Sequence, residues 1–167
     1  MRKGSGKRLT HVDARGAARM VDVSSKPETV RVAVARGSLS LSPEAFRAVA
    51  ANEIRKGDVM AVARLAGIQA AKGAGSLIPL CHPIPIDHVE VSTRLDDRTH
   101  RLEIEARVKA HWSTGVEMEA LTAVTVAGLA AYDMIKSVDK TAVLSDVRLV
   151  SKTGGRSGAY RRRGERA

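Results

Sequence analysis

Apolar and polar residues alternate in three segments of the chain. The alternation covers residues 29–41, 89–95 and 102–108. A period of two is typical of a strand that buries one face, so each segment is predicted to be a strand. Two aspartates and an arginine at residues 96–98 separate the second and third segments and predict a hairpin turn. A fourth strand is predicted over residues 143–150.

Two helices are predicted between the first strand and the hairpin. Ser42 has the side chain of a helix N-cap, and a proline and a glutamate follow it, as is typical of a first turn. This helix is predicted to reach about residue 54. Asp58 is positioned to cap a second helix over residues 59–72, which we expect Gly73 and Gly75 to end.

A third, longer helix is predicted over residues 116–138, and its middle carries no charge. Residues 120–131 contain no ionisable side chain and consist mostly of Ala, Val, Leu, Gly and Thr. A helix that is apolar on all sides is buried on several of them. The apolar stretch is shorter than the roughly 20 residues that a bilayer requires, so we expect no membrane span.

The predicted order is strand, helix pair, strand, strand, helix, strand. This is the split β-α-β-β-α-β order of a ferredoxin-like domain. We therefore expect an α+β fold, with a ferredoxin-like antiparallel sheet and helices packed on one face.

Composition adds limits on size, partners and location. The chain has 167 residues, 44% of them apolar, and a formal net charge of +10. We expect one domain over residues 9–158, between flexible basic tails at 1–8 and 159–167. The positive charge favours anionic partners. The single cysteine excludes an intrachain disulfide, and with no recognisable targeting or membrane segment we expect a cytoplasmic location.

Charged side chains stand at both ends of the long apolar helix. Glu117 and Glu119 precede the apolar stretch, and Asp133 and Lys136 follow it. Residues three apart lie on one helical face, so the last two predict a carboxylate beside an ammonium. Such a pair suits acid/base chemistry, and it equally suits a structural salt bridge where the helix meets solvent.

Further lysines and a glycine loop could bind phosphates. Lys56 and Lys72 would act as point charges if they converged on one pocket, although any single lysine is commonly solvated surface. Amines that converge would also lower one another's pKa. Residues 151–157, SKTGGRS, combine unhindered backbone N–H groups with two cations, which suits an anion, but the spacing is not that of a P-loop.

An apolar loop over residues 77–85 contains three prolines and is predicted to form a wall rather than a solvated linker. Cys81 and His82 lie within it. The other histidines lack zinc-site spacing, so we expect no metal. Adjacent residues seldom face each other, which disfavours a thiol nucleophile activated by this histidine. His82 is either a proton-transferring residue or a loop histidine with no chemical role.

Several motifs together resemble those of the MoaC family, the cyclic pyranopterin monophosphate synthases of molybdenum cofactor biosynthesis. They are MVDVSSK (20–26), KGDV (56–59), AGIQAAK (66–72), LIPLCHP (77–83), TGVEMEALTA (114–123) and YDMIK (132–136), with LTHVD (9–13) and SKTGGRSG (151–158) near the ends. The resemblance covers nearly the whole chain. Ser113 departs from it, since relatives often carry a basic residue there.

The resemblance implies a reaction and an assembly. Such enzymes convert 3′,8-cyclo-7,8-dihydro-GTP to cyclic pyranopterin monophosphate and release diphosphate, without a metal or organic cofactor. They are homohexamers, built as trimers of dimers, with each site at a dimer interface. Asp133 and Lys136 would be the catalytic acid/base pair, with Lys56 and His82 in proton transfer or substrate contact. The implied substrate-binding residues are Leu80, Cys81, His82, Glu117, Met118 and Glu119, with Lys72 and Arg31 for phosphates.

Two other functions compete with this enzyme. A basic ferredoxin-like domain could bind RNA by stacking bases on aromatic side chains of its sheet. The predicted strands lack such residues, and Trp112 is isolated just past the hairpin. We therefore expect neither a nucleic-acid nor a membrane partner. A non-catalytic oligomeric scaffold is the second alternative, which turnover of the substrate would exclude.

Overall fold

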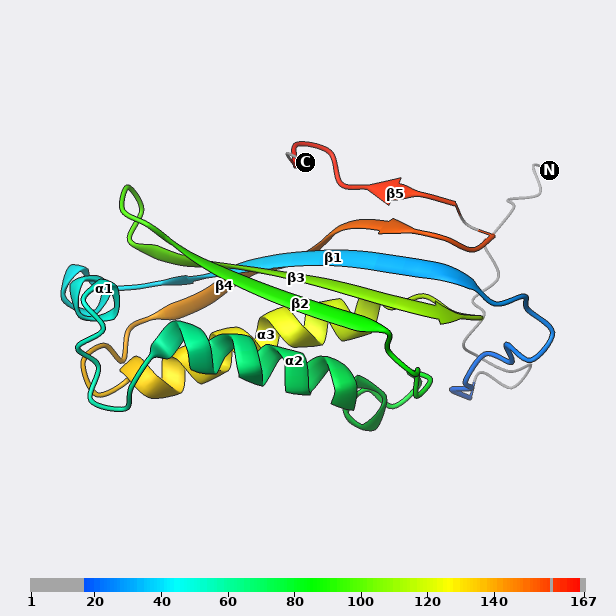
Figure 1. Ribbon diagram of the computed structural model, residues 1–167, viewed down its shortest axis with the longest axis horizontal. Coiled ribbons are helices and arrows are strands. Elements are labelled where there is room, and N and C mark those ends of the chain that lie inside the picture. Colours follow the sequence, from blue (N-terminus) through cyan, green and yellow to red (C-terminus); the bar gives the residue numbers. More distant parts are fainter. Residues whose placement is uncertain (1–16, 157, 166–167) are drawn as a thin grey trace, which may run out of the picture.

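The structure is a computed structural model that describes residues 17–156 and 158–165. Eight elements follow one another along the chain (Figure 1). They are β1 (Thr29–Ser40), α1 (Pro43–Ala50), α2 (Val59–Leu77), β2 (His88–Asp96), β3 (Arg101–Trp112), α3 (Glu117–Ile135), β4 (Val143–Thr153) and β5 (Tyr160–Arg161). The expected N-terminal tail, residues 1–8, and the LTHVD motif lie outside the described residues.

The strands form one sheet in the order β2-β3-β1-β4-β5, and every neighbouring pair is antiparallel. The helices α2 and α3 lie side by side across one face, and α1 lies at one end of the sheet (Figure 1). The first four strands have the order that the split β-α-β-β-α-β arrangement requires. The predicted α+β, ferredoxin-like fold is confirmed.

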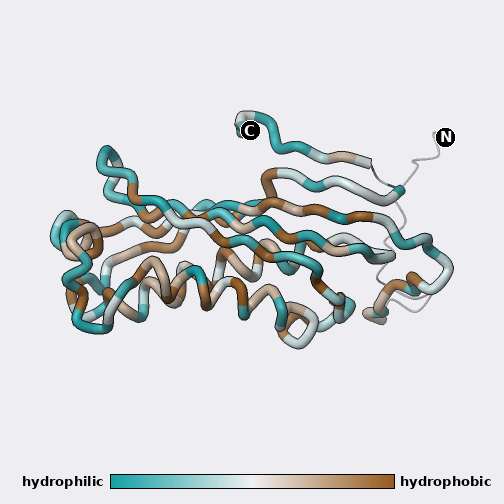
Figure 2. Tube along the Cα trace, in the orientation of Figure 1, coloured by the Kyte–Doolittle hydropathy of each residue, from teal (hydrophilic) through white to brown (hydrophobic). Residues whose placement is uncertain are grey.

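The core lies between the sheet and the two long helices. In the register, Leu39 pairs with Leu102 and Ala35 pairs with Ala106, and all four side chains are buried. Figure 2 shows that hydrophilic residues gather instead in the β2–β3 turn and the C-terminal segment. The core is built largely from Ala, Val, Leu and Ile, which lets the layers approach closely.

α3 has the length and the apolar composition of a membrane-crossing helix, but ten of its residues are buried within the protein. It packs against α2, β1, β3 and β4. A core helix can have the same length and hydropathy as a membrane-crossing helix, because burial in protein and burial in lipid both exclude charged side chains. The packing explains the composition of α3 without a membrane.

Three helix ends differ from those predicted, and one of them is that of α3, which ends at Ile135 rather than near residue 138. α1 ends at Ala50 rather than near residue 54, because Asn52 takes a left-handed backbone conformation with φ 55°. α2 continues to Leu77, through both glycines that were expected to end it. At Gly75 a Cβ would lie 3.0 Å from Pro83 Cα, so this glycine permits close packing against the proline loop.

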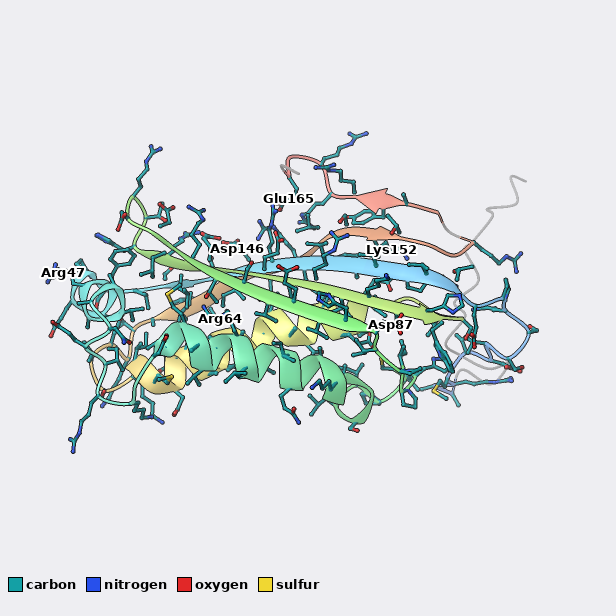
Figure 3. The ribbon with its side chains drawn as sticks, in the orientation of Figure 1. Arg47, Arg64, Asp87, Asp146, Lys152 and Glu165 are labelled. Carbon is teal, nitrogen blue, oxygen red and sulfur yellow. The ribbon has the colours of Figure 1, made fainter. Side chains whose placement is uncertain are left out.

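The opposite face of the sheet carries charged side chains and holds the C-terminal segment. Arg36 binds Glu105 at 2.6 Å and Glu165 at 3.0 Å, and Arg148 also pairs with Glu165. Figure 3 shows Glu165 on the side of the sheet away from α2 and α3. Tyr160 pairs with Lys152 in the short strand β5. Within the segment expected to be a flexible tail, Tyr160 and Arg161 pair with β4, and Glu165 contacts two arginines.

A buried carboxylate ties the α3–β4 connection to α1. Asp139 is 4% exposed. One oxygen accepts from the backbone N–H of Ser42 at 2.6 Å, and the other accepts from the backbone N–H and hydroxyl of Thr141 at 2.8 and 2.7 Å. Ser42 is the N-cap of α1, so Asp139 holds the start of one helix beside the loop that follows another.

We predict that Asp139→Ala lowers the free energy of unfolding by about 1–3 kcal/mol, since it leaves the backbone N–H groups of Ser42 and Thr141 without their acceptor. Urea denaturation at a fixed protein concentration measures the change. Asp97→Ala, at an exposed position of the β2–β3 turn, is the control and should change stability little. Equal effects of the two substitutions would contradict the role of Asp139.

Candidate functional site

Three charged side chains converge at the C-terminal end of α3. Asp133 and Lys136 lie one turn apart, and their Oδ1 and Nζ atoms are 2.7 Å apart. Lys56, in the connection between α1 and α2, places its Nζ 2.7 Å from the other carboxylate oxygen and 2.7 Å from the backbone carbonyl of Asp133. We call these three residues the acid–amine cluster. Their side chains are 46–56% exposed.

The cluster fixes the charge on its members. Hydrogen bonds from Lys136 and then from Lys56 lower the pKa of Asp133 to about 2. The hydrogen bond to Asp133 raises the pKa of Lys136. At neutral pH the cluster is therefore a carboxylate held between two amines, with Lys136 protonated. In this state Lys136 can donate a proton, while the carboxylate orients both amines.

A second candidate region lies at the N-terminal end of α3. A cavity of about 530 Å³ opens between the start of β1, the residues before α3 and the loop after β4. Its cationic lining residues are Lys26, Arg31, Lys152 and Arg156. We call it the glycine-loop pocket, because Gly154 and Gly155 also line it. Four cations beside a helix N-terminus favour an anionic ligand.

Two features place Arg31 in this pocket. Its Nε and Nη2 donate to the carbonyl oxygens of Trp112 at 3.0 Å and Ser113 at 3.1 Å. Gly155 supplies the space, since a Cβ there would lie 1.8 Å from Arg31 Nη1. Gly155 also has a φ of 76°, a conformation that other residues rarely adopt. The glycine in SKTGGRS is thus required by both its backbone and its neighbour.

Glu117 joins the pocket to the helix. It is the first residue of α3 and binds Lys152 Nζ at 2.6 Å. Lys152 pairs with the buried Ala33 on the face of the sheet toward α3, and Figure 3 labels it along β4. The ion pair connects the glycine loop with the start of α3, and one acid among four cations leaves the pocket positively charged.

The proline loop forms the neighbouring wall. A hollow of about 410 Å³ is lined by Leu80, Cys81, His82 and Met118. Lys26 and Glu117 line both this hollow and the glycine-loop pocket, so the two are contiguous. The loop predicted to be an apolar wall thus borders the cationic region. Together they could hold a ligand with a polyphosphate and a flat ring system.

Lys72 and Glu119 lie in another hollow. They share it with Ser76 and Pro83, and Lys72 is absent from the lining of the glycine-loop pocket. The structure therefore does not bring Lys72 together with Arg31, the other residue expected to bind phosphates. No group of three or more His, Cys, Asp or Glu side chains suited to a metal ion occurs within residues 17–156 and 158–165.

The two candidate regions are far apart within one chain. Glu117 and Asp133 are separated by 16 helical positions, which correspond to about 24 Å along α3. Lys56, Asp133 and Lys136 come together at one end, and His82 lies near the other. One chain therefore holds two partial sites.

Comparisons with known proteins identify the family. The model of the MoaC family matches residues 20–155. The chain belongs to the MoaC family. A relative from Thermomicrobium roseum, named cyclic pyranopterin monophosphate synthase, is 57% identical over 159 residues, which cover 95% of this chain and 96% of the relative. A relative of the same name from Heliobacterium modesticaldum is 58% identical, with 91% and 96% of the chains covered.

A human relative extends the comparison. Molybdenum cofactor biosynthesis protein 1 of Homo sapiens is 49% identical over 158 residues, which cover 95% of this chain and 25% of the human protein. The family match spans every motif from MVDVSSK to YDMIK. Both candidate regions contain such motifs: YDMIK lies in the acid–amine cluster, and LIPLCHP and TGVEMEALTA lie near the glycine-loop pocket.

Three pocket cations were not among the residues predicted to bind the ligand. They are Lys26, Lys152 and Arg156. The last two belong to the glycine loop that the sequence indicated as an anion site, so the loop signal could have identified them. Lys26 ends the MVDVSSK motif of this MoaC-family chain, and nothing in its local pattern sets it apart from a surface lysine.

We predict that Gly155→Ala weakens binding of inorganic diphosphate about tenfold or more, because the added methyl displaces Arg31 and removes charge-assisted hydrogen bonds. Isothermal titration calorimetry measures the affinity. Gly158→Ala is a matched control, since Gly158 also has a positive φ, 67°, but a Cβ added there would meet no atom within 4 Å. Similar losses in both variants would mean that backbone strain alone is responsible.

We also predict an unusually acidic Asp133. Aspartate ordinarily titrates near 3.9, whereas Asp133 has a pKa of about 2. Because the folded pKa is the lower one, the cluster stabilises the folded chain above about pH 3.9, and this contribution disappears as pH falls toward about 2. Carbon-13 NMR of the carboxyl group should show this in the wild type, and the doubly substituted Lys56→Met, Lys136→Met protein should titrate near the ordinary value. An ordinary titration in the wild type would contradict the geometry.

Proposed function

We propose that this protein converts 3′,8-cyclo-7,8-dihydro-GTP to cyclic pyranopterin monophosphate and diphosphate in the first stage of molybdenum cofactor biosynthesis. It is a lyase of the cyclic pyranopterin monophosphate synthase type. The observation that carries the proposal is the presence of two complementary partial sites on one chain. One end of α3 offers an anion pocket beside an apolar wall, and the other offers a carboxylate with two amines.

The two partial sites complete one another if two protomers pack with their α3 helices antiparallel. The end of α3 that carries Asp133 then faces the glycine-loop pocket of a neighbouring protomer. The outer surfaces of α2 and α3 favour such packing, because Leu65 is 68% exposed and Leu129 is 54% exposed. We propose that this interface lies within a homohexamer built as a trimer of dimers.

The glycine-loop pocket suits the phosphates of the substrate. The oxygen of a sugar hydroxyl attacks the α-phosphorus and gives up its proton to a general base or to solvent, the new P–O bond closes the cyclic phosphate, and the bond to diphosphate breaks. The leaving group gains negative charge as this happens. Arg31 and Lys152 are cations held in place by hydrogen bonds and an ion pair, and Arg156 adds a third positive charge, so the pocket can stabilise the charge of the leaving group with little reorganisation.

The acid–amine cluster suits the proton transfers of the ring rearrangement. Lys136 is protonated and donates, Asp133 keeps both amines oriented, and Lys56 provides the second amine. His82 lines the hollow beside Met118 and is placed to accept or relay a proton from the ring. No step of this scheme calls on a metal or an organic cofactor.

RNA binding is not favoured by any specific observation. Strands β1, β2 and β4 contain no Phe, Tyr or Trp, Trp112 is the last residue of β3, and Tyr160 lies in the edge strand β5. The central strands therefore offer no row of aromatic side chains on which bases could stack. We propose that the enzyme works in the cytoplasm, on a substrate that derives from a soluble nucleotide, with neither nucleic acid nor membrane as partner.

Purified protein should release diphosphate from the cyclised dihydro-GTP, and Lys136→Ala or Asp133→Asn should abolish this release. The reason is that each substitution removes a charge that the proton transfers require. A coupled diphosphate assay measures turnover, and light scattering measures assembly. If either variant loses its assembly rather than its turnover, the cluster is a structural salt bridge and the proposed role is wrong.

Mixed oligomers test whether two chains build each site. Lys136→Ala and Arg31→Ala are each expected to be inactive alone, since they damage opposite ends of α3. Random co-assembly in equal amounts should restore about one quarter of wild-type turnover, because each site takes one half from each of two chains. Sites formed within single chains would give no recovery at all.

A further inference from the structure

Glu119, which the family resemblance implies as a substrate-binding residue, is a buried acid to which the proposed chemistry assigns no step. It is the third residue of α3 and is only 2% exposed. Its Oε1 lies 3.6 Å from Cys81 Sγ, and its Oε2 has no hydrogen-bond partner among the described residues. No cation forms a salt bridge with Glu119 in the part of the chain that the structure describes.

The number of hydrogen atoms available to the thiol and the acid determines which protonation state of Glu119 fits these contacts. Cys81 Sγ also lies 3.6 Å from the backbone carbonyl oxygen of His82. A thiol has one hydrogen and can donate to one acceptor at a time. If Glu119 were ionised, the thiol would face two acceptors and satisfy one. If Glu119 carries a proton on Oε1, the acid donates to the sulfur and the thiol donates to His82, so both contacts are satisfied.

The protonation state of the Cys81 thiol is consistent with a hydrogen bond from the sulfur to the His82 carbonyl oxygen. Burial is the largest cause that raises the pKa of Cys81 to about 11, so the sulfur keeps its hydrogen at neutral pH. A thiolate could not donate to the His82 carbonyl. Cys81 is therefore a donor and acceptor between two groups, rather than a nucleophile.

Burial also favours the protonated form of Glu119. An ionised carboxylate without a partner costs several kcal/mol to bury, and burial is the main reason why the pKa of Glu119 is raised, with Glu117 adding to it. Its own backbone N–H and Cys81 act in the opposite sense. The helix N-terminus would also favour the anion, but by only about 0.3–1 kcal/mol, or 2 at most. Lys72, which lines the same hollow, makes no ion pair with it.

We infer that Glu119 is a neutral carboxylic acid that holds the proline loop through the thiol of Cys81, and thereby positions His82 at the pocket. The contact crosses 38 residues of sequence and joins α3 to the loop that carries His82. Glu119 is thus a positioning residue, which acts on the reaction through His82. The kinetic consequence rests on the proposed function, whereas the protonation state rests on the geometry alone.

Infrared spectroscopy tests the protonation state without any assay of turnover. The difference between the wild type and Glu119→Gln at neutral pH should contain the carbonyl stretch of a protonated carboxylic acid. The appearance of a carboxylate band in its place would overturn the inference. This result stands whether or not the protein releases diphosphate, so failure of the proposed function would be recognised separately.

Kinetics tests the positioning role. Glu119→Leu should lower kcat about tenfold or more, or about 1.4 kcal/mol in the barrier. Glu119→Gln should recover most of that loss, because its amide N–H still donates to the sulfur, and its pH profile should follow that of the wild type. A glutamine variant as defective as the leucine variant would show that the negative charge is required, and would overturn the inference.

A double-mutant cycle separates this relay from two independent effects. Cys81→Ala should lower kcat by about as much as Glu119→Leu, and the combined variant should lose no more than either alone. Light scattering and circular dichroism confirm that each variant is folded and assembled. Additive losses would mean that the two side chains act separately, and the relay would be wrong.

Discussion

The burial of α3 against the sheet on one side and α2 on another is the constraint on which the rest of the structure depends. The close contact leaves no room for larger side chains: a Cβ at Gly67 of α2 would lie 2.9 Å from the backbone oxygen of Ala123, in the middle of α3. An unpaired charge there would have to be buried at a cost of several kcal/mol. Reactive side chains are therefore confined to the two ends of the helix, and the length of α3 holds them apart.

This separation links assembly to chemistry. A chain that keeps its cations at one end of a rigid helix and its carboxylate–amine group at the other cannot bring them to one ligand by moving side chains. In the proposed assembly, a second chain in the opposite direction would do so without any conformational change. The exposed leucines on the outer helical surface would then be apolar area that the proposed interface removes from water. Stability of the oligomer and completeness of the site would thus depend on the same surface.

The parts of the fold that depend on local pattern could be predicted from the sequence. The strands follow from alternation, and the proximity of Asp133 and Lys136 follows from helical spacing. Contacts between distant segments could not be predicted in this way. A glycine at position 75 predicted a helix end from local pattern alone. Its actual role is to pack closely against Pro83, and that contact depends on the path of the loop between them. Likewise, the hydrogen bonds of Lys56 to Asp133 span 77 residues, and only the family resemblance placed those two together.

The acid–amine cluster contributes little to the stability of the fold. Its ion pairs are about half exposed, and ion pairs in that position contribute little to stability, since solvent screens them and ordering long side chains costs entropy. The fold has a better anchor nearby in the buried Asp139, which already joins this end of α3 to α1. A second, solvent-exposed set of charges adds little to that connection. Two amines held on one carboxylate are instead what a site requires when it must present fixed positive charge and a transferable proton at a defined place.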